Sequence, residues 1–238
     1  MRKQHTELKG ESTVNSTPEG VGFVAVANGD GLCEIFTDLG VNEIVSGGQT
    51  MNPSTEQLLE AIKRVGLRTV FVLPNNSNIV MAATSAARLA EEEGIDARVI
   101  ASKSIPQGIT AMCSYDPDAD VEQNYAALRA SLSTVKTLSL TNAVRDASID
   151  GMTIKEGQFI GLIENKVKRV SDDLFGCLDL LIDELNDASC VTAYCGEDMS
   201  DELADAVRVR LEERLGSDAD VTVVRGGQPV YSLIISGE

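Results

Sequence analysis

Neutral amide and hydroxyl side chains are the residues of this sequence best placed to bind something. Amides do not titrate, so they are poor acid–base catalysts. Most of these side chains directly follow predicted strands, and loops at the carboxyl ends of parallel strands share the sheet edge where ligands bind. We favour a role in capping helices and bracing loops; recognition of a ligand or a partner is the alternative. The residues are Asn28, Gln49, Thr50, Asn52, Asn75, Asn76, Asn78, Ser104, Gln107 and Gln228.

The sequence lacks the common catalytic sets. It contains neither a G-x-x-x-x-G-K-[ST] phosphate loop nor a G-x-S-x-G nucleophile turn. Gly29 and Gly31 precede a predicted helix, as in a dinucleotide-binding turn, but Glu34 stands where the third glycine belongs. The single histidine, His5, lies in the N-terminal tail, which argues against a Ser-His-Asp triad or a histidine-bearing zinc site in the core. We expect no catalytic residue, metal ion or cofactor in this chain.

Carboxylates are abundant, and the formal net charge at pH 7 is −17. Residues 171–220 hold 15 acids and three bases. Like charges repel one another along a helix, so a cationic partner would reduce this repulsion. We interpret these acids as a docking surface for a basic protein face; the alternatives are helix capping and general solubility. The acids of this set are Asp179, Asp183, Asp187, Asp201, Asp205, Glu212 and Glu213.

The composition limits which kinds of partner the chain can bind and in which cellular compartment it is expected. Nucleic acid and anionic membranes need a basic protein surface, which this chain does not offer. No apolar run approaches the length of a transmembrane helix, and the polar N-terminus does not resemble a signal peptide. Five cysteines without a C-x-x-C pair predict buried, reduced thiols in a cytoplasmic protein. A disulfide between Cys190 and Cys195 is the alternative.

Strand and helix patterns alternate along the chain, which predicts an α/β fold. The pattern divides into a first lobe with a mostly parallel sheet covered by helices on both faces, and a second lobe with a mixed α/β sheet. We assign residues 1–19 to a linker or the tail of a preceding domain, 20–134 to the first subdomain and 135–238 to the second. In the first lobe the predicted strands are 21–27, 43–46, 69–73 and 97–101, and the predicted helices are 29–39, one starting at 52–57, 78–93 and 121–132.

The second lobe opens with short strands separated by turns, which predicts a small meander. Its strands are predicted at 138–144, 152–154, 158–163, 167–170, 190–195, 221–225 and 230–235, and its helices at 174–185 and 201–215.

An internal repeat is also visible. Residues 23–49 and 190–228 each combine a strand, a glycine turn, a helix, a strand and Gly-Gly-Gln. Two related lobes would explain this repeat. Coincidence is the alternative, because glycine often follows a strand.

Six longer motifs are distinctive: GGQTMNPSTEQLLEAI (47–62), LPNNSNIVMAA (73–83), KSIPQGITAM (103–112), NAVRDASIDG (142–151), YCGEDMS (194–200) and GGQPVYSLIIS (226–236). Through these motifs, residues from about 20 to 238 resemble the C-terminal region of the large chain of bacterial fatty acid kinase. That family is also described as dihydroxyacetone kinase-like. The segment MRKQHTELK resembles the end of the family's middle domain.

The resemblance implies a division of labour. An upstream domain of the whole protein would hold ATP and magnesium, and a middle domain would carry dimerisation and catalytic residues. The C-terminal part would have a DegV-like fold and would dock a DegV-type protein that presents a fatty acid for phosphorylation, feeding phospholipid synthesis. This chain alone would then not be an enzyme. The alternative is a DegV-like carrier that binds a small molecule or fatty acid at the amide-rich edge of the first lobe.

Overall fold

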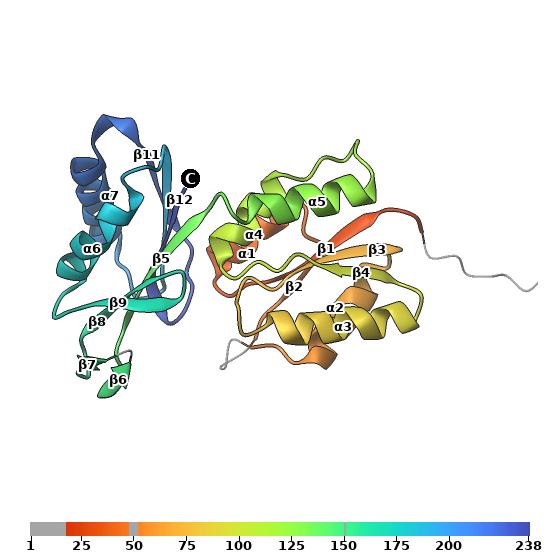
Figure 1. The fold of residues 1–238 in the computed structure, drawn as a ribbon, viewed down its shortest axis with the longest axis horizontal. Helices are drawn as coiled ribbons and strands as arrows, with labels where there is room; N and C mark the ends of the chain where they lie inside the picture. Colours follow the sequence, from red (N-terminus) through yellow and green to blue (C-terminus); the bar gives the residue numbers. More distant parts are fainter. Residues whose placement is uncertain (1–17, 48–51, 150) are drawn as a thin grey trace, which may run out of the picture.

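The computed structural model describes residues 18–47, 52–149 and 151–238 of the chain. Two β-sheets lie side by side, each with helices of its own (Figure 1). We call residues 18–135 the first lobe and residues 136–238 the second lobe. The predicted two-lobed α/β fold is confirmed, with a parallel sheet in the first lobe and a mixed sheet in the second.

Sheet A of the first lobe contains four parallel strands in the order β2-β1-β3-β4. Its central strands β1 and β3 are almost fully buried, as their apolar sequences predict. Because β2 lies on one side of β1 and β3 on the other, the connections diverge between β1 and β3, where such sheets bind ligands. The strands are β1 Val21–Val26, β2 Glu43–Val45, β3 Thr69–Leu73 and β4 Asp96–Val99.

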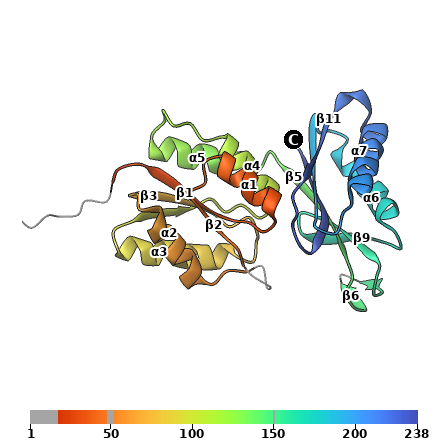
Figure 2. The same ribbon diagram turned by 180° about the vertical axis from the view of Figure 1, so that it is seen from behind.

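Helices cover both faces of sheet A (Figure 1 and Figure 2). Even-numbered residues of β1 and β3 belong to the core shared with α2 and α3, whereas odd-numbered residues belong to the core shared with α1, α4 and α5. This alternation follows from the pleat of a strand, which directs successive side chains to opposite faces. The helices are α1 Asp30–Asp38, α2 Thr55–Val65, α3 Val80–Glu92, α4 Ile105–Cys113 and α5 Val121–Ser131.

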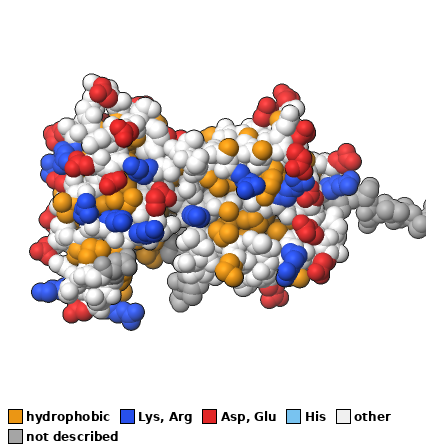
Figure 3. All heavy atoms as spheres, in the orientation of Figure 1, with side chains coloured by type: hydrophobic (Ala, Val, Ile, Leu, Met, Phe, Trp, Pro, Cys, Tyr) orange, Lys and Arg blue, Asp and Glu red, His pale blue; other side chains and the backbone are white. Residues whose placement is uncertain are grey.

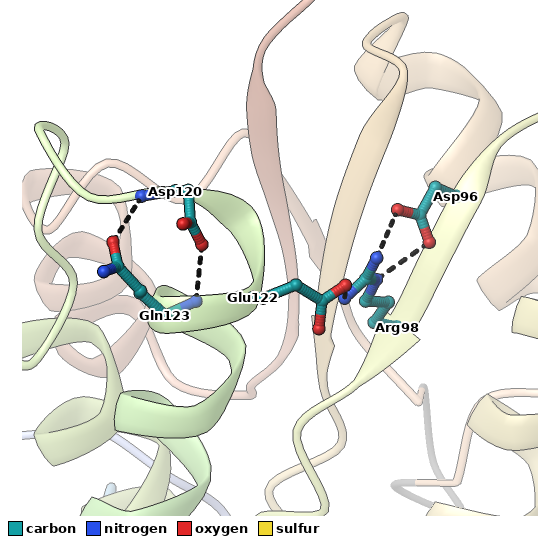
Figure 4. Close-up of polar contacts among 5 residues, drawn as sticks. All are labelled: Asp96, Arg98, Asp120, Glu122 and Gln123. Carbon is teal, nitrogen blue, oxygen red and sulfur yellow. Dashed lines mark hydrogen bonds and ion pairs between the residues drawn. The ribbon is translucent and has the colours of Figure 1, made fainter.

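Two of these helices start at reciprocal capping boxes. At α2 the Gln57 side chain accepts from the Ser54 amide at 2.9 Å, and the Ser54 hydroxyl accepts from the Gln57 amide at 3.2 Å. Asp120 and Gln123 form the same pair at α5, at 3.1 and 2.8 Å (Figure 4). Both boxes satisfy amides that the first helical turn leaves without partners.

The sequence pattern does not indicate α4, because Pro106 and Gly108 interrupt it. The proline occupies the first turn, where the helix needs no amide donor. A Cβ at position 108 would lie only 2.0 Å from Asn75 Oδ1, so glycine is needed for close packing. Tertiary contact therefore decides the residue at this position.

Sheet B of the second lobe has the strand order β11-β10-β12-β5-β8-β9, and only the β10–β11 pair is parallel. Helices α6 and α7 cover the face turned away from the first lobe (Figure 1). The predicted meander differs in one detail, because β7 pairs with β6 in a separate hairpin. The elements are β5 Lys136–Asn142, β6 Ala147–Ile149, β7 Met152–Ile154, β8 Phe159–Ile163, β9 Lys166–Ser171, α6 Leu174–Ile182, β10 Cys190–Cys195, α7 Asp201–Leu215, β11 Asp220–Arg225 and β12 Tyr231–Gly237, with short 3-10 turns at Asp183–Leu185 and Gly216–Asp218.

The two lobes meet through a close approach of backbones. Gly29 and Gly31 lie at the start of α1, and Gly226 directly follows β11. The amide of Leu32 donates to the carbonyl of Gly226 at 3.0 Å. A Cβ on Gly31 would lie 1.8 Å from the carbonyl oxygen of Arg225, and one on Gly29 would lie 2.5 Å from that of Gly226. Only glycine permits these contacts.

This approach also completes α1. No side chain caps the start of α1, and the carbonyl from the second lobe accepts a first-turn amide instead. Beside this contact, Leu32 packs with Tyr194 and Ile234 of sheet B in a small core shared by both lobes. The glycine turn after β1 is thus occupied by the Gly-Gly-Gln segment of the second lobe.

We predict that Gly31→Ala separates or shifts the lobes. The added methyl group meets backbone that cannot rotate away, so the free energy of unfolding should fall by about 1–3 kcal/mol. Urea unfolding measures this loss, and small-angle scattering should show a larger radius of gyration.

Gly216→Ala is the control. Gly216 has φ +72° and open space around it. With ψ −157° its backbone lies in a region that is essentially restricted to glycine, so its substitution costs about 1–3 kcal/mol, and it should leave the radius of gyration unchanged. An unchanged radius for Gly31→Ala would contradict the assigned contact.

Candidate functional site

A cavity of about 240 Å³ lies between the lobes, beside the carboxyl ends of β1 and β3. Side chains from both lobes line it, and most are amides, hydroxyls or aliphatic groups. Lys103 is the one charged side chain among its lining residues in the described part of the chain. The polar lining residues are Asn28, Asn75, Asn76, Ser77, Asn78, Lys103, Ser104, Thr137, Ser139, Asn165, Gln228 and Tyr231.

Asn75 anchors the first-lobe side of the cavity. It is only 6% exposed and has φ 56°, a left-handed conformation that asparagine tolerates. Its Nδ2 donates to the carbonyl of Val26 at 3.0 Å, and its Oδ1 accepts from the hydroxyl of Ser102 at 2.7 Å. The side chain therefore ties the ends of β1 and β3 to the segment after β4.

Other polar contacts link the two lobes around the cavity. The hydroxyls of Ser104 and Thr137 lie 2.7 Å apart, and both residues are buried. The Nδ2 of Asn165 donates to the carbonyl of Lys103 at 3.0 Å. The cavity walls are thus held by fixed hydrogen bonds rather than by apolar contact alone.

Gln228 contributes an acceptor whose hydrogen-bonding capacity is unused. The residue is 2% exposed, and its Nε2 donates to the carbonyls of Tyr194 at 2.7 Å and Tyr231 at 3.3 Å. Its Oε1 is buried and has no hydrogen-bond partner among the residues described. A buried acceptor without a donor costs about 1–3 kcal/mol, so a bound molecule that donates to it would be favoured.

The cavity lining offers mainly hydrogen-bond donors and acceptors. Burial raises the pKa of the Tyr231 hydroxyl, which therefore stays protonated and able to donate at neutral pH. Together with Lys103 it offers donors to a ligand rich in acceptors. No carboxylate lines the cavity among the described residues.

The structure brings together part of the predicted amide set. Six predicted residues line the cavity: Asn28, Asn75, Asn76, Asn78, Ser104 and Gln228. Asn52 is exposed outside it. Gln107 instead braces the α4 region, accepting from the Lys103 amide at 2.8 Å and donating to the Leu132 carbonyl at 3.1 Å. Gln49 and Thr50 lie outside the described residues.

Apart from Gln228, sequence reasoning missed the polar residues on the second-lobe side of the cavity. Thr137, Ser139 and Asn165 line it from sheet B and the β8–β9 turn. Their local sequence carries no binding signal. The short strands that hold them predict a sheet, and only the docking of that sheet reveals the site.

Most of the predicted acidic docking set is paired within the chain. The arginines of α7 and β11 neutralise five of the seven acids, and no ion pair is formed by Asp187 or Glu213 within the described residues. The pairs are Asp179 with Arg210 and Arg214, both at 3.4 Å; Asp183 with Arg214 at 2.9 Å; Asp205 with Arg208 at 3.5 Å; Glu212 with Arg208 at 3.2 Å; and Asp201 with Arg225.

The predicted acidic face of the helix at 174–185 is also shorter than expected. The α-helix ends at Ile182 and a 3-10 turn follows, so Asp187 lies beyond the helix. Asp179 is half-buried, with a side chain 31% exposed, whereas Asp183 is 73% exposed. The acids therefore do not form one continuous unpaired row.

Not all of the cysteine thiols are buried as the sequence predicts. Cys177 and Cys195 are buried and Cys33 is half-buried, but Cys113 and Cys190 are exposed. All five are free. A bond between Cys190 and Cys195 does not form, because they occupy opposite ends of β10. The two exposed thiols lie at element ends, α4 for one and β10 for the other, where packing leaves them open.

The family follows from comparison with known sequences. A family model described as FakA-like, the C-terminal part of a fatty acid kinase chain, matches residues 22–238. The chain belongs to this family. YloV of Bacillus subtilis (strain 168) is 38% identical over 246 residues, a match that includes 100% of this chain and 44% of YloV. The chain spans less than half the length of the curated relatives it matches.

Solved structures place this member of the FakA-like C-terminal family in a known fold. The DegV family protein Cg2579 of Corynebacterium glutamicum aligns with a TM-score of 0.67 at 13% identity, over 92% of this chain and 96% of its own. A fatty-acid-binding DegV family protein of Thermus thermophilus gives 0.62 at 13%, over 92% and 99%. The dihydroxyacetone kinase of C. freundii gives 0.60 at 11%, over 91% and 48%. The DegV-like fold implied by the resemblance is confirmed.

None of the helices among the described residues combines the length and apolar character that crossing a bilayer requires. The described residues also contain no group of three or more His, Cys, Asp or Glu side chains arranged to hold a metal ion.

We predict that Asn75→Asp destabilises the fold at neutral pH. The substitution replaces the donor to the Val26 carbonyl with a carboxylate oxygen, at a cost of about 1–3 kcal/mol. Asn78→Asp, at an exposed position of the same loop, should change the free energy of unfolding by less than about 0.5 kcal/mol. Equal effects in urea unfolding would contradict the bracing role of Asn75.

We predict that iodoacetamide distinguishes the thiols. Burial raises the pKa of Cys177 to about 11; at pH 8 only about one such thiol in a thousand is ionised. Peptide mass spectrometry should find Cys190 modified well before Cys177. The order should vanish in urea, and rapid modification of Cys177 in the folded protein would be inconsistent with its buried position.

Proposed function

We propose that this chain is a non-catalytic docking module within the large chain of a fatty acid kinase. It binds a DegV-type fatty-acid-binding protein and holds the acyl carboxylate within reach of the upstream ATP-binding domain. The match to the FakA-like C-terminal family over residues 22–238 is the observation that carries this proposal. ATP and magnesium would then bind upstream, in the part of the protein that this chain does not span.

The chemistry of the chain supports a role without catalysis. Its interlobe cavity is lined by side chains that donate and accept hydrogen bonds and, among the described residues, by no carboxylate or histidine. The single histidine belongs to residues 1–17 at the N-terminal end of the sequence. Phosphoryl transfer needs metal-bound nucleotide and a group that orients the nucleophile, and we assign both to the upstream domains.

The acidic docking surface takes a narrower form than the sequence predicts. Asp187 and Glu213 are the members of the predicted set without an ion pair among the described residues, so a basic partner can reach them without breaking an existing pair. The paired acids would first have to exchange one cation for another, which yields little net energy at an exposed surface.

The test is sedimentation of this chain with the DegV-type partner at low salt. We expect a complex that weakens as salt rises, because exposed charges are screened over about 10 Å at 0.1 M. The double variant Asp187→Lys/Glu213→Lys should weaken it further. Glu34→Lys/Glu92→Lys reverses two exposed acids of the first lobe and should leave it intact. Absence of a complex would refute the docking function, and equal losses would refute the assigned surface.

A carrier function is the second candidate, favoured by the buried and unpartnered Gln228 Oε1. The cavity of about 240 Å³ is smaller than the roughly 300–1,000 Å³ of pockets that enclose drug-sized ligands. It would suit a head group better than a long acyl chain. Native mass spectrometry of the purified chain decides the matter: a stoichiometric acyl ligand would favour the carrier over the docking module.

A further inference from the structure

A second groove lies on the first lobe and is lined by residues of α3, α5 and the β4 segment. Strand β4, at the edge of sheet A, lies between α3 and α5 there. Figure 3 shows apolar surface with Lys and Arg side chains over this region. We call it the β4 groove; its lining residues are Val80, Thr84, Ala87, Arg88, Glu91, Ala97, Arg98, Val99, Ala101, Tyr125 and Arg129.

One edge of β4 carries no strand. Its inner edge is paired with β3: the Asp96 amide donates to the Arg68 carbonyl and the Ile100 amide to the Val72 carbonyl, at 2.8 and 2.9 Å. The amides of Ala97 and Val99 therefore face away from β3. The Ala97 amide donates to the carbonyl of Ile95 at 2.9 Å, which leaves the Val99 amide for an added strand. No described strand pairs with that outer edge. An open edge of this kind is a template for an added extended segment.

The groove also carries unpaired positive charge. Arg98 is already neutralised: Asp96 accepts from it twice at 2.9 Å, and Glu122 accepts once at 2.7 Å (Figure 4). Arg88 of α3 and Arg129 of α5 are exposed and form no ion pair among the described residues. Two guanidinium groups without an ion pair in the described part of the chain thus flank the strand edge in a chain of net charge −17, and that of Arg129 lies over the Tyr125 ring at 5.3 Å. Glu91 also lines the groove, so the two arginines exceed the unpaired acid there by one charge.

These two arginines lie on opposite faces of sheet A, because α3 and α5 cover opposite faces. Side chains of an added strand also alternate between the two faces. Neighbouring acidic residues of an extended peptide would therefore meet Arg88 and Arg129 in turn. Between the arginines, the groove offers Tyr125 and small apolar side chains for contact with the rest of the peptide.

We propose that the β4 groove binds an extended acidic segment of a partner protein, which pairs with β4 as a fifth strand of sheet A. A second copy of this chain fits less well. Symmetric pairing would place two basic grooves against each other, and short edge strands with charged side chains resist such self-association. This binding is independent of the docking surface on the second lobe.

The test uses a fluorescein-labelled peptide of sequence GVEEVEEVG and fluorescence anisotropy at low ionic strength. Binding should exceed that of GVKKVKKVG, although the chain as a whole repels anions. The double variant Arg88→Glu/Arg129→Glu should weaken binding about tenfold. Arg145→Glu/Arg169→Glu makes the same charge change at exposed second-lobe sites and should alter it by less than about twofold.

Four results would overturn the proposal. One is binding no stronger than that of the lysine peptide, and another is an equal loss in both double variants. The third concerns strand pairing: a peptide N-methylated throughout its centre keeps its charges but loses its donors, so it should bind much more weakly. Undiminished binding would exclude strand addition. The last concerns self-association. Sedimentation of the chain alone should show a monomer. A dimer that Arg88→Glu/Arg129→Glu abolishes would assign the groove to a second copy of the chain.

Discussion

The contact between the start of α1 and the Gly-Gly-Gln segment of the second lobe is the constraint on which the molecule depends. It leaves no room for a side chain at Gly29 or Gly31, and it supplies the carbonyl that caps α1. Because this contact fixes the second lobe beside the carboxyl ends of β1 and β3, it also creates the interlobe cavity. One backbone approach thus determines the lobe arrangement, a helix start and the candidate site.

The polar residues around that approach serve two purposes at once. Asn75 holds the ends of two strands together through buried hydrogen bonds. Gln228 uses both of its amide hydrogens on carbonyls and keeps an unpartnered oxygen. Fully satisfied polar groups rigidify a fold, whereas an unsatisfied one marks a place where a ligand or water gains energy. Bracing and binding are therefore compatible roles for the same amide cluster.

Charge is distributed more evenly than a net value of −17 implies. The arginines of the second lobe neutralise most acids of α6 and α7, which leaves a few unpaired carboxylates on that lobe. The first lobe has the opposite feature, a groove with two unpaired arginines beside an open strand edge. Net charge governs long-range encounter, whereas these local exceptions determine which surface a partner can occupy.

The sequence by itself determined the fold class and the family, because periodicity and long motifs are local properties of the chain. It also placed Asn28 and Asn75 at one sheet edge. Only the tertiary structure decided the second-lobe wall of the cavity, the pairing of Asp179 with Arg210 and Arg214, and the open edge of β4. Each of these features depends on how segments far apart in the sequence are arranged in space. No local sequence pattern specifies which distant surfaces will meet.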